Sequence, residues 1–174
     1  MQWDWPNQLE GWHEFFVLIG TAGAALTGLL FVVVSVGSRV VAHDRTTGVK
    51  AFLSPNAVHF TTTLIVSAIC LVPGLPSGAI GSLLCAAAAG SLAYLVSTKA
   101  HEHWRRNKLP LLDWIWFVAL PLATYGLLLL AGVGFLLQAA WSMHSLAVAL
   151  ILLLVVGIRN AWDIVIWMSR QEHK

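Results

Sequence analysis

Residues 54–76 read SPNAVHFTTTLIVSAICLVPGLP and decide the fold class. Ser54 and Pro55 are typical of a helix start, because serine caps free N–H groups and proline suits the first helical position. The mostly apolar run that ends before Pro73 is about as long as a helix that crosses a bilayer, which needs roughly 17–25 residues. The VPGLP segment after it fits only a tight turn. The stretch therefore predicts a hairpin of two membrane-spanning helices.

The composition of the whole chain agrees with a membrane protein. Of its 174 residues, 58% are hydrophobic and only 10% are charged, whereas a soluble domain carries about 25% charged residues. A water-soluble globule and a disordered chain are both excluded on this basis. We predict an all-α fold: one polytopic membrane helix bundle that covers residues 1–174, with a kink at Pro121. The five predicted transmembrane helices cover about 15–38, 55–72, 76–97, 112–138 and 141–168.

The basic residues predict how the helices are oriented. All ten lysines and arginines fall in the loop 39–50, the loop 99–108 and the tail that begins at Arg159. The N-terminal segment and the turns after the second and fourth helices have none. Basic residues favour the cytosolic side of a membrane. With five crossings, this pattern places the N-terminus outside and the C-terminus in the cytosol.

A polar stripe runs along the second predicted helix. At three- and four-residue spacing its members share an arc of about 80°, and in lipid such groups must face protein or water. One interpretation is hydrogen bonding between helices. The other is a hydrated pathway in which His59 is a titratable gate near the cytosolic mouth. The stripe consists of Asn56, His59, Thr63, Ser67 and Cys70.

Small residues recur at helical spacing on two predicted helices, where they allow two backbones to approach closely in lipid. We expect them to pack helices within one bundle or to form a seam between copies in a homo-oligomer. They are Gly20, Ala24 and Gly28 on the first helix, and Gly78, Gly81, Ser82 and Cys85 on the third.

Three polar residues near the end of the fifth predicted helix form another candidate site. Arg159 and Asp163 are four residues apart, which favours an ion pair on one helix face. The arginine is then either a snorkelling residue with a partner, or part of a docking site. In the second interpretation Arg159, Asn160 and Asp163 bind another helix or a cytosolic partner.

The sequence gives little sign of a metal or of catalysis. His13, Glu14 and His144 fall at similar depth near the outer face and are side chains that Zn²⁺ accepts. Nothing in their spacing forces them together, so we predict no metal and no other cofactor. The chain has no P-loop, nucleophile elbow, HExxH motif or GxGxxG motif. We therefore expect a protein that is not an enzyme.

Three stretches, WHEFFVLIGTAGAALTGLLFV, FLSPNAVHF and RNAWD, resemble segments of small uncharacterised bacterial integral membrane proteins. Some proteins of this kind are labelled modulators of the membrane protease FtsH. The resemblance implies a bacterial inner-membrane location and a role other than catalysis.

Two functions remain open at this point. The first is a non-enzymatic interaction or regulatory subunit whose partners are the lipid bilayer and either further copies of itself or another membrane protein. The second is a homo-oligomeric ion channel or small-solute pathway lined by the polar stripe. Because the basic residues are explained by membrane topology, we expect no nucleic-acid partner.

Overall fold

The computed structural model describes residues 9–43, 48–102 and 114–171, and within these ranges the chain is helical, without strands. This confirms the predicted all-α class. The elements are α2 (His13–His43), α3 (Gly48–Leu71), α4 (Ser77–Glu102), the π-helical segment η1 (Ile115–Ala119), α6 (Leu120–Leu136) and α7 (Ser142–Gln171).

Four of the helical segments in the described ranges are long and apolar enough to cross a membrane. They are His13–Val33, Ser77–Ser97, Ile115–Leu136 and Ser142–Asp163. In α3 the apolar segment Pro55–Leu71 is shorter. A long apolar helix satisfies all its backbone hydrogen bonds internally, which is what a lipid environment requires. By length and composition, the chain therefore carries the helices of a membrane-embedded protein.

The start of α3 differs from the prediction. The helix begins at Gly48, and Pro55 lies inside it. Proline lacks an N–H group and interrupts the hydrogen-bond ladder of a helix interior, which is why Ser54–Pro55 resembles a helix start. Membrane helices nevertheless tolerate an internal proline, so the helix continues upstream of Pro55.

The fourth predicted helix contains a π-helical turn. Of the predicted range 112–138, residues 112 and 113 lie outside the described residues, and η1 leads directly into α6. Pro121 is the second residue of α6 and follows η1 without a break, so its missing N–H group interrupts the hydrogen-bond ladder of a continuous helix. Where the sequence predicted a kink at Pro121, the structure has the π-helical turn η1 just before the proline.

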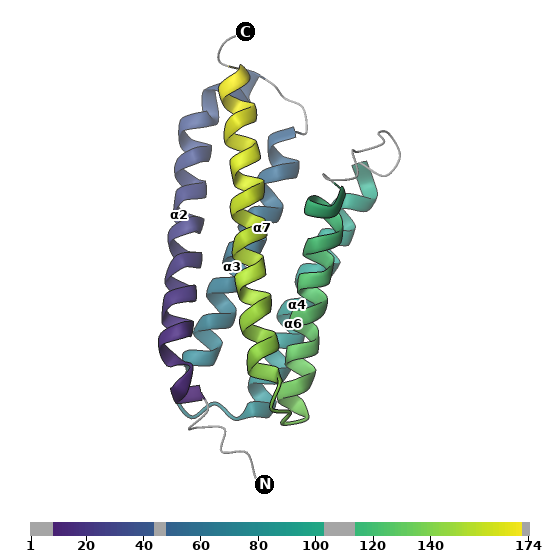
Figure 1. Ribbon diagram of the computed structural model, residues 1–174. Coiled ribbons are helices and arrows are strands. Elements are labelled where there is room, and N and C mark those ends of the chain that lie inside the picture. The colour runs from purple at the N-terminus through teal and green to yellow at the C-terminus, as the bar shows by residue number, and fades with distance from the viewer. Residues whose placement is uncertain (1–8, 44–47, 103–113, 172–174) are drawn as a thin grey trace.

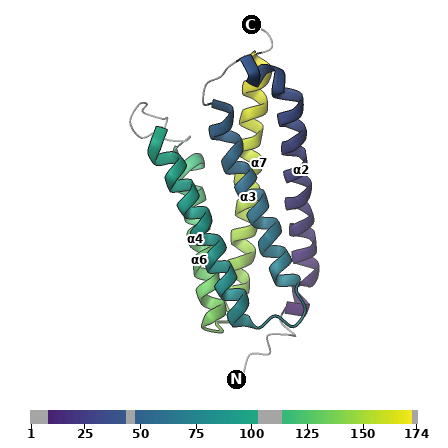
Figure 2. The same ribbon diagram turned by 180° about the vertical axis from the view of Figure 1, so that it is seen from behind.

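The helices form an up-and-down bundle in which α2, α4 and α7 run one way and α3 and α6 run back (Figures 1 and 2). The long helix α7 packs against both α3 and α6, while α2 packs mainly on α3 and α4 mainly on α6. Accordingly, 56% of the residues in the apolar window of α7 are buried, against 28% in those of α2 and α4. The centre of the bundle is therefore α7, and α2 and α4 are its outer helices.

One end of the bundle, called here the basic end, is where α2 finishes and α3 begins (upper end in Figure 1). The helix ends that carry Arg39, Lys50 and Lys99 lie there, as does the C-terminal part of α7 with Arg159. The turns at the opposite end, 72–76 and 137–141, contain neither lysine nor arginine. The remaining basic residues are Arg170 in the last turn of α7 and, outside the described residues, Arg45, Arg105, Arg106, Lys108 and Lys174.

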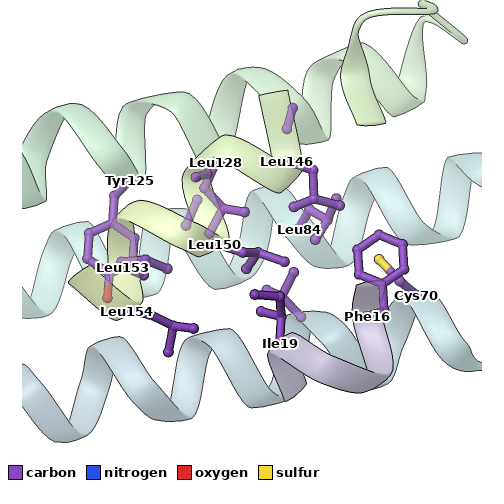
Figure 3. Close-up of a cluster of buried hydrophobic side chains, with 14 of the residues drawn as sticks. Phe16, Ile19, Cys70, Leu84, Tyr125, Leu128, Leu146, Leu150, Leu153 and Leu154 are labelled. Atoms are coloured by element: carbon purple, nitrogen blue, oxygen red, sulfur yellow. The ribbon is translucent and has the colours of Figure 1, made fainter. Parts of the chain in front are cut away.

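Buried hydrophobic side chains from all the long helices fill the bundle. Figure 3 shows part of this cluster, including Phe16 of α2, Leu84 of α4, Leu128 of α6 and Leu150 of α7, all fully buried. Burial of such side chains away from lipid contributes dispersion contacts rather than a hydrophobic effect, because lipid is equally apolar. Close packing therefore decides which helices associate.

Candidate functional site

The polar stripe of α3 faces the inside of the bundle. Asn56, His59, Thr63 and Ser67 are fully buried and Cys70 is 5% exposed. On the opposite side of the same helix, Ile65 is exposed. The stripe is thus covered by other helices of the same chain, as lipid requires for polar groups.

The middle of the stripe is part of a hydrogen-bonded group that we call the polar cluster: His59, Thr62, Ser91 and Tyr125. The His59 Nδ1 and Tyr125 hydroxyl are 2.9 Å apart, and the hydroxyls of Thr62 and Ser91 are 3.1 Å apart. Thr62 and Ser91 also lie near the Tyr125 hydroxyl. The cluster therefore ties α3 to both α4 and α6 through buried polar groups.

Other hydroxyls near the cluster are bonded within their own helices. Thr63 Oγ1 donates to the His59 carbonyl at 3.0 Å, and Thr124 Oγ1 donates to the Leu120 carbonyl at 2.8 Å. Such back-bonding satisfies a hydroxyl without a second helix. The polar cluster, and not these threonines, is what links the helices.

Two buried asparagines differ from the rest. Both amide atoms of Asn56, the Oδ1 of Asn160 and the hydroxyl of Ser67 are buried without a hydrogen-bond partner among the described residues. Asn160 is 4% exposed, so it lies inside the bundle and is not available to the external partner that the sequence suggested. The side chains of Arg159 and Asp163 are much more exposed than that of Asn160.

Arg159 and Asp163 form the predicted ion pair along α7. Their side chains are 38% and 35% exposed, and the guanidinium carbon lies 5.9 Å from the centre of the Trp116 ring in η1. The ring faces a cation at a distance that allows a weak attraction. The pair is half-exposed at the basic end of α7 and touches η1.

We expect the Asp163→Asn variant to change the free energy of unfolding by less than about 1 kcal/mol, because half-exposed ion pairs contribute little. Denaturation in mixed detergent micelles measures this quantity. A loss of several kcal/mol would mean that Asp163 has a structural role beyond the pair.

The small residues that the sequence singled out divide into packed and exposed ones. Gly20 contacts Ser67 of α3; Gly81 and Cys85 contact Gly132 of α6. Ala24, Gly28, Gly78 and Ser82 are exposed, and nothing lies within 4 Å of a Cβ added at Gly28 or Gly78. At Gly28 and Gly78, therefore, no described residue packs against the helix.

The outward side of α4 is lined by small residues. We call it the small-residue face of α4. A Cβ added at Gly90 also meets nothing within 4 Å, and Ser82 Oγ donates to the Gly78 carbonyl of its own helix at 2.8 Å. The hydroxyl of Ser82 is therefore satisfied within α4. One large side chain, Leu83, is also exposed on this side (44%), three residues before Ala86 and seven before Gly90. The face consists of Gly78, Ser82, Ala86, Ala89, Gly90 and Ala93, all exposed.

The candidate metal site is not assembled in the described residues. Within them, no group of three or more His, Cys, Asp or Glu side chains lies close enough to hold a metal ion. His144 instead packs its ring edge-on against Trp12 at 5.3 Å between ring centres, while His13 and Glu14 are exposed. Proximity in depth alone does not bring the three side chains into coordination geometry.

Three members of the polar cluster were missed in the sequence. Thr62 lies beside the stripe, and Ser91 looks like one more small residue in an alanine-rich helix. Tyr125 carried the clearest available signal, since it is one of only two tyrosines and lies inside an apolar span. A buried tyrosine hydroxyl in a membrane helix needs a polar partner, which His59 supplies.

The fold and the buried polar groups define an all-helical protein whose helices are apolar enough for a membrane. No family model matches the chain, and no curated protein or solved structure shows significant similarity to it.

Proposed function

We propose that the protein crosses a bacterial inner membrane five times, with the basic end in the cytosol and the N-terminus outside. The distribution of lysine and arginine between the two ends of the bundle supports this orientation. The fifth crossing is α3, whose apolar segment Pro55–Leu71 is near the lower limit of a membrane span. Its helical extension to Gly48 lengthens it toward the basic end.

We further propose that the protein is a non-enzymatic interaction or regulatory subunit. Its binding site is the small-residue face of α4, and its partner is a transmembrane helix of a different membrane protein. The observation that carries this proposal is the uncovered line of Gly78, Ser82 and Gly90 on an outer helix. Small residues at this spacing let helices approach closely in lipid.

The opposite side of α4 illustrates what such residues do. There, Gly81 lies against Gly132 of α6 so closely that an added Cβ would be 2.7 Å from the Gly132 carbonyl oxygen. On the outward face, the missing side chains of Gly78 and Gly90 likewise let a second helix approach the backbone of α4. Because the Ser82 hydroxyl is already bonded within α4, the expected contact is mainly van der Waals packing against small residues of the partner.

A Gly90→Leu variant is expected to lose most of its partner binding. A photo-crosslinking residue at Ala86 should capture one protein in native membranes, and Gly90→Leu should reduce this product at least about tenfold, equivalent to about 1.4 kcal/mol. The matched control is Gly126→Leu on α6, since Gly126 is also exposed with nothing within 4 Å. That variant should leave the product unchanged.

Three outcomes would contradict the proposal. The first is equal loss in both variants, and the second is a product that survives Gly90→Leu. The third is a product of twice the chain mass, which would assign the face to a second copy.

The alternative of a homo-oligomeric channel places the polar stripe along an axis shared between copies. In the structure, Asn56, His59, Thr63 and Ser67 are buried within one copy, which gives a pore between copies no support.

A further inference from the structure

The side chain of Asn56 stands out among the buried polar groups of the described residues. It is fully buried, and neither its Nδ2 nor its Oδ1 has a partner among the described residues. A polar group left unpaired inside a membrane protein costs several kcal/mol. A buried carboxamide with both atoms unpaired therefore indicates a bound molecule that completes its bonds.

Asn160 is buried at the same level on α7. The ring of Phe60 lies directly against Gly157, which fixes the level at which α3 and α7 meet. The two helices run in opposite directions. Asn56 is one turn before Phe60 on α3, and Asn160 is about one turn after Gly157 on α7, so both lie on the same side of this contact. The Oδ1 of Asn160 is also unpaired among the described residues. One donor and two acceptors thus lie at one level of the α3–α7 interface.

The unpaired amide group and the two unpaired carbonyl oxygens indicate that the bound molecule is water. A direct bond from Asn56 Nδ2 to Asn160 Oδ1 would leave the Asn56 oxygen unsatisfied. Water donates two hydrogen bonds and accepts others, so it can serve both carbonyl oxygens and the amide together. The nearest charged groups on α7, Arg159 and Asp163, neutralise each other, so the site does not call for an ion.

The position of the two asparagines indicates the side from which water enters. Asn56 is the second residue of the apolar segment of α3, and Asn160 is about 27 Å along α7 from Ser142, within one turn of the end of its apolar window. Half-exposed Arg159 and Asp163 adjoin it. Toward the other end, α7 buries large apolar side chains such as Leu146 and Leu150.

We propose that Asn56 and Asn160 bind internal water in a hydrated site that opens only to the basic end and stops at the His59–Tyr125 hydrogen bond. This inference does not depend on the small-residue face of α4. A Gly90→Leu variant should therefore leave the water access of Asn56 and Asn160 unchanged. Either proposal can then fail while the other stands.

Cysteine accessibility tests the hydrated site. In a Cys70→Ala, Cys85→Ala background, Asn160→Cys should react with a small water-soluble methanethiosulfonate at least about tenfold faster than Leu153→Cys, at a fully buried position two turns away on α7. The reaction should occur only when reagent is added on the side of the basic end. Equal rates at the two positions, or faster reaction from the opposite side, would overturn the proposal.

A measurement on the unaltered protein guards against a variant that does not fold. The chain has four asparagines, so selective ¹⁵N labelling gives four side-chain amide signals, assignable by single Asn→Gln variants. In solid-state NMR of the protein in bilayers, polarisation transfer from water should reach the Asn56 and Asn160 amides as fast as it reaches exposed side chains. Transfer to both that is as slow as to buried leucines would contradict bound water.

Discussion

Replacing Gly132 with leucine is expected to separate α4 from α6 and to have the largest effect of any single substitution considered. A Cβ added at Gly132 would lie 2.7 Å from the Cys85 sulfur and 3.0 Å from both the Cys85 nitrogen and the Gly81 carbonyl oxygen. Two of these three atoms belong to the backbone, which cannot move without displacing α4. Overpacking of this kind costs about 3 kcal/mol.

Equilibrium unfolding in mixed micelles provides the measurement, with Gly126→Leu as the matched control. Both glycines are on α6, but a Cβ at Gly126 meets nothing within 4 Å. The control should therefore unfold almost as the native protein does, whereas Gly132→Leu should unfold at much lower denaturant. Similar midpoints for the two variants would show that the α4–α6 contact does not depend on backbone approach at Gly132.

The His59→Leu variant is expected to lose about 2 kcal/mol of stability, the second-largest effect. Leucine keeps most of the side-chain volume but removes the buried bond of 2.9 Å to the Tyr125 hydroxyl. A buried polar group that loses its partner costs roughly 1–3 kcal/mol. Thr124→Val is the control, because this buried hydroxyl donates to the Leu120 carbonyl of its own helix, and its loss should cost less than about 1 kcal/mol.

A double-mutant cycle separates the hydrogen bond from packing effects. Tyr125→Phe alone should also destabilise the protein, but the His59→Leu, Tyr125→Phe double variant should lose clearly less than the sum of the two. Replacing both partners by apolar groups removes both ends of this bond, so neither end is left unpaired. Strictly additive losses would mean that His59 and Tyr125 contribute independently, and that the polar cluster does not join α3 to α6.

Local spacing predicted some features of the site correctly. The ion pair of Arg159 and Asp163 was predictable because its partners are one helical turn apart. The inward direction of the polar stripe follows from its periodicity, since His59 and its neighbours share one side of α3 that lipid cannot solvate. Both features depend on one helix only.

Features that involve two helices were harder to predict. Gly78 and Gly81 are almost one turn apart on a helix with small residues on both sides, so the sequence does not say which of them meets α6. The pairing of His59 with Tyr125 needs the relative position of α3 and α6, which are not neighbours in the chain. Side-chain fit, rather than periodicity, decides such pairings.

The central place of α7 has a consequence for how the protein is made. This helix follows the other four in the chain, yet it packs against both α3 and α6. In the five-crossing topology proposed above, α3 and α6 enter the bilayer before it. Until residues 142–171 leave the translocon, Asn56 therefore lacks the neighbour that Asn160 provides. In that topology we expect a four-helix stage of insertion in which the polar side of α3 is still open and water or an insertion chaperone shields it from lipid.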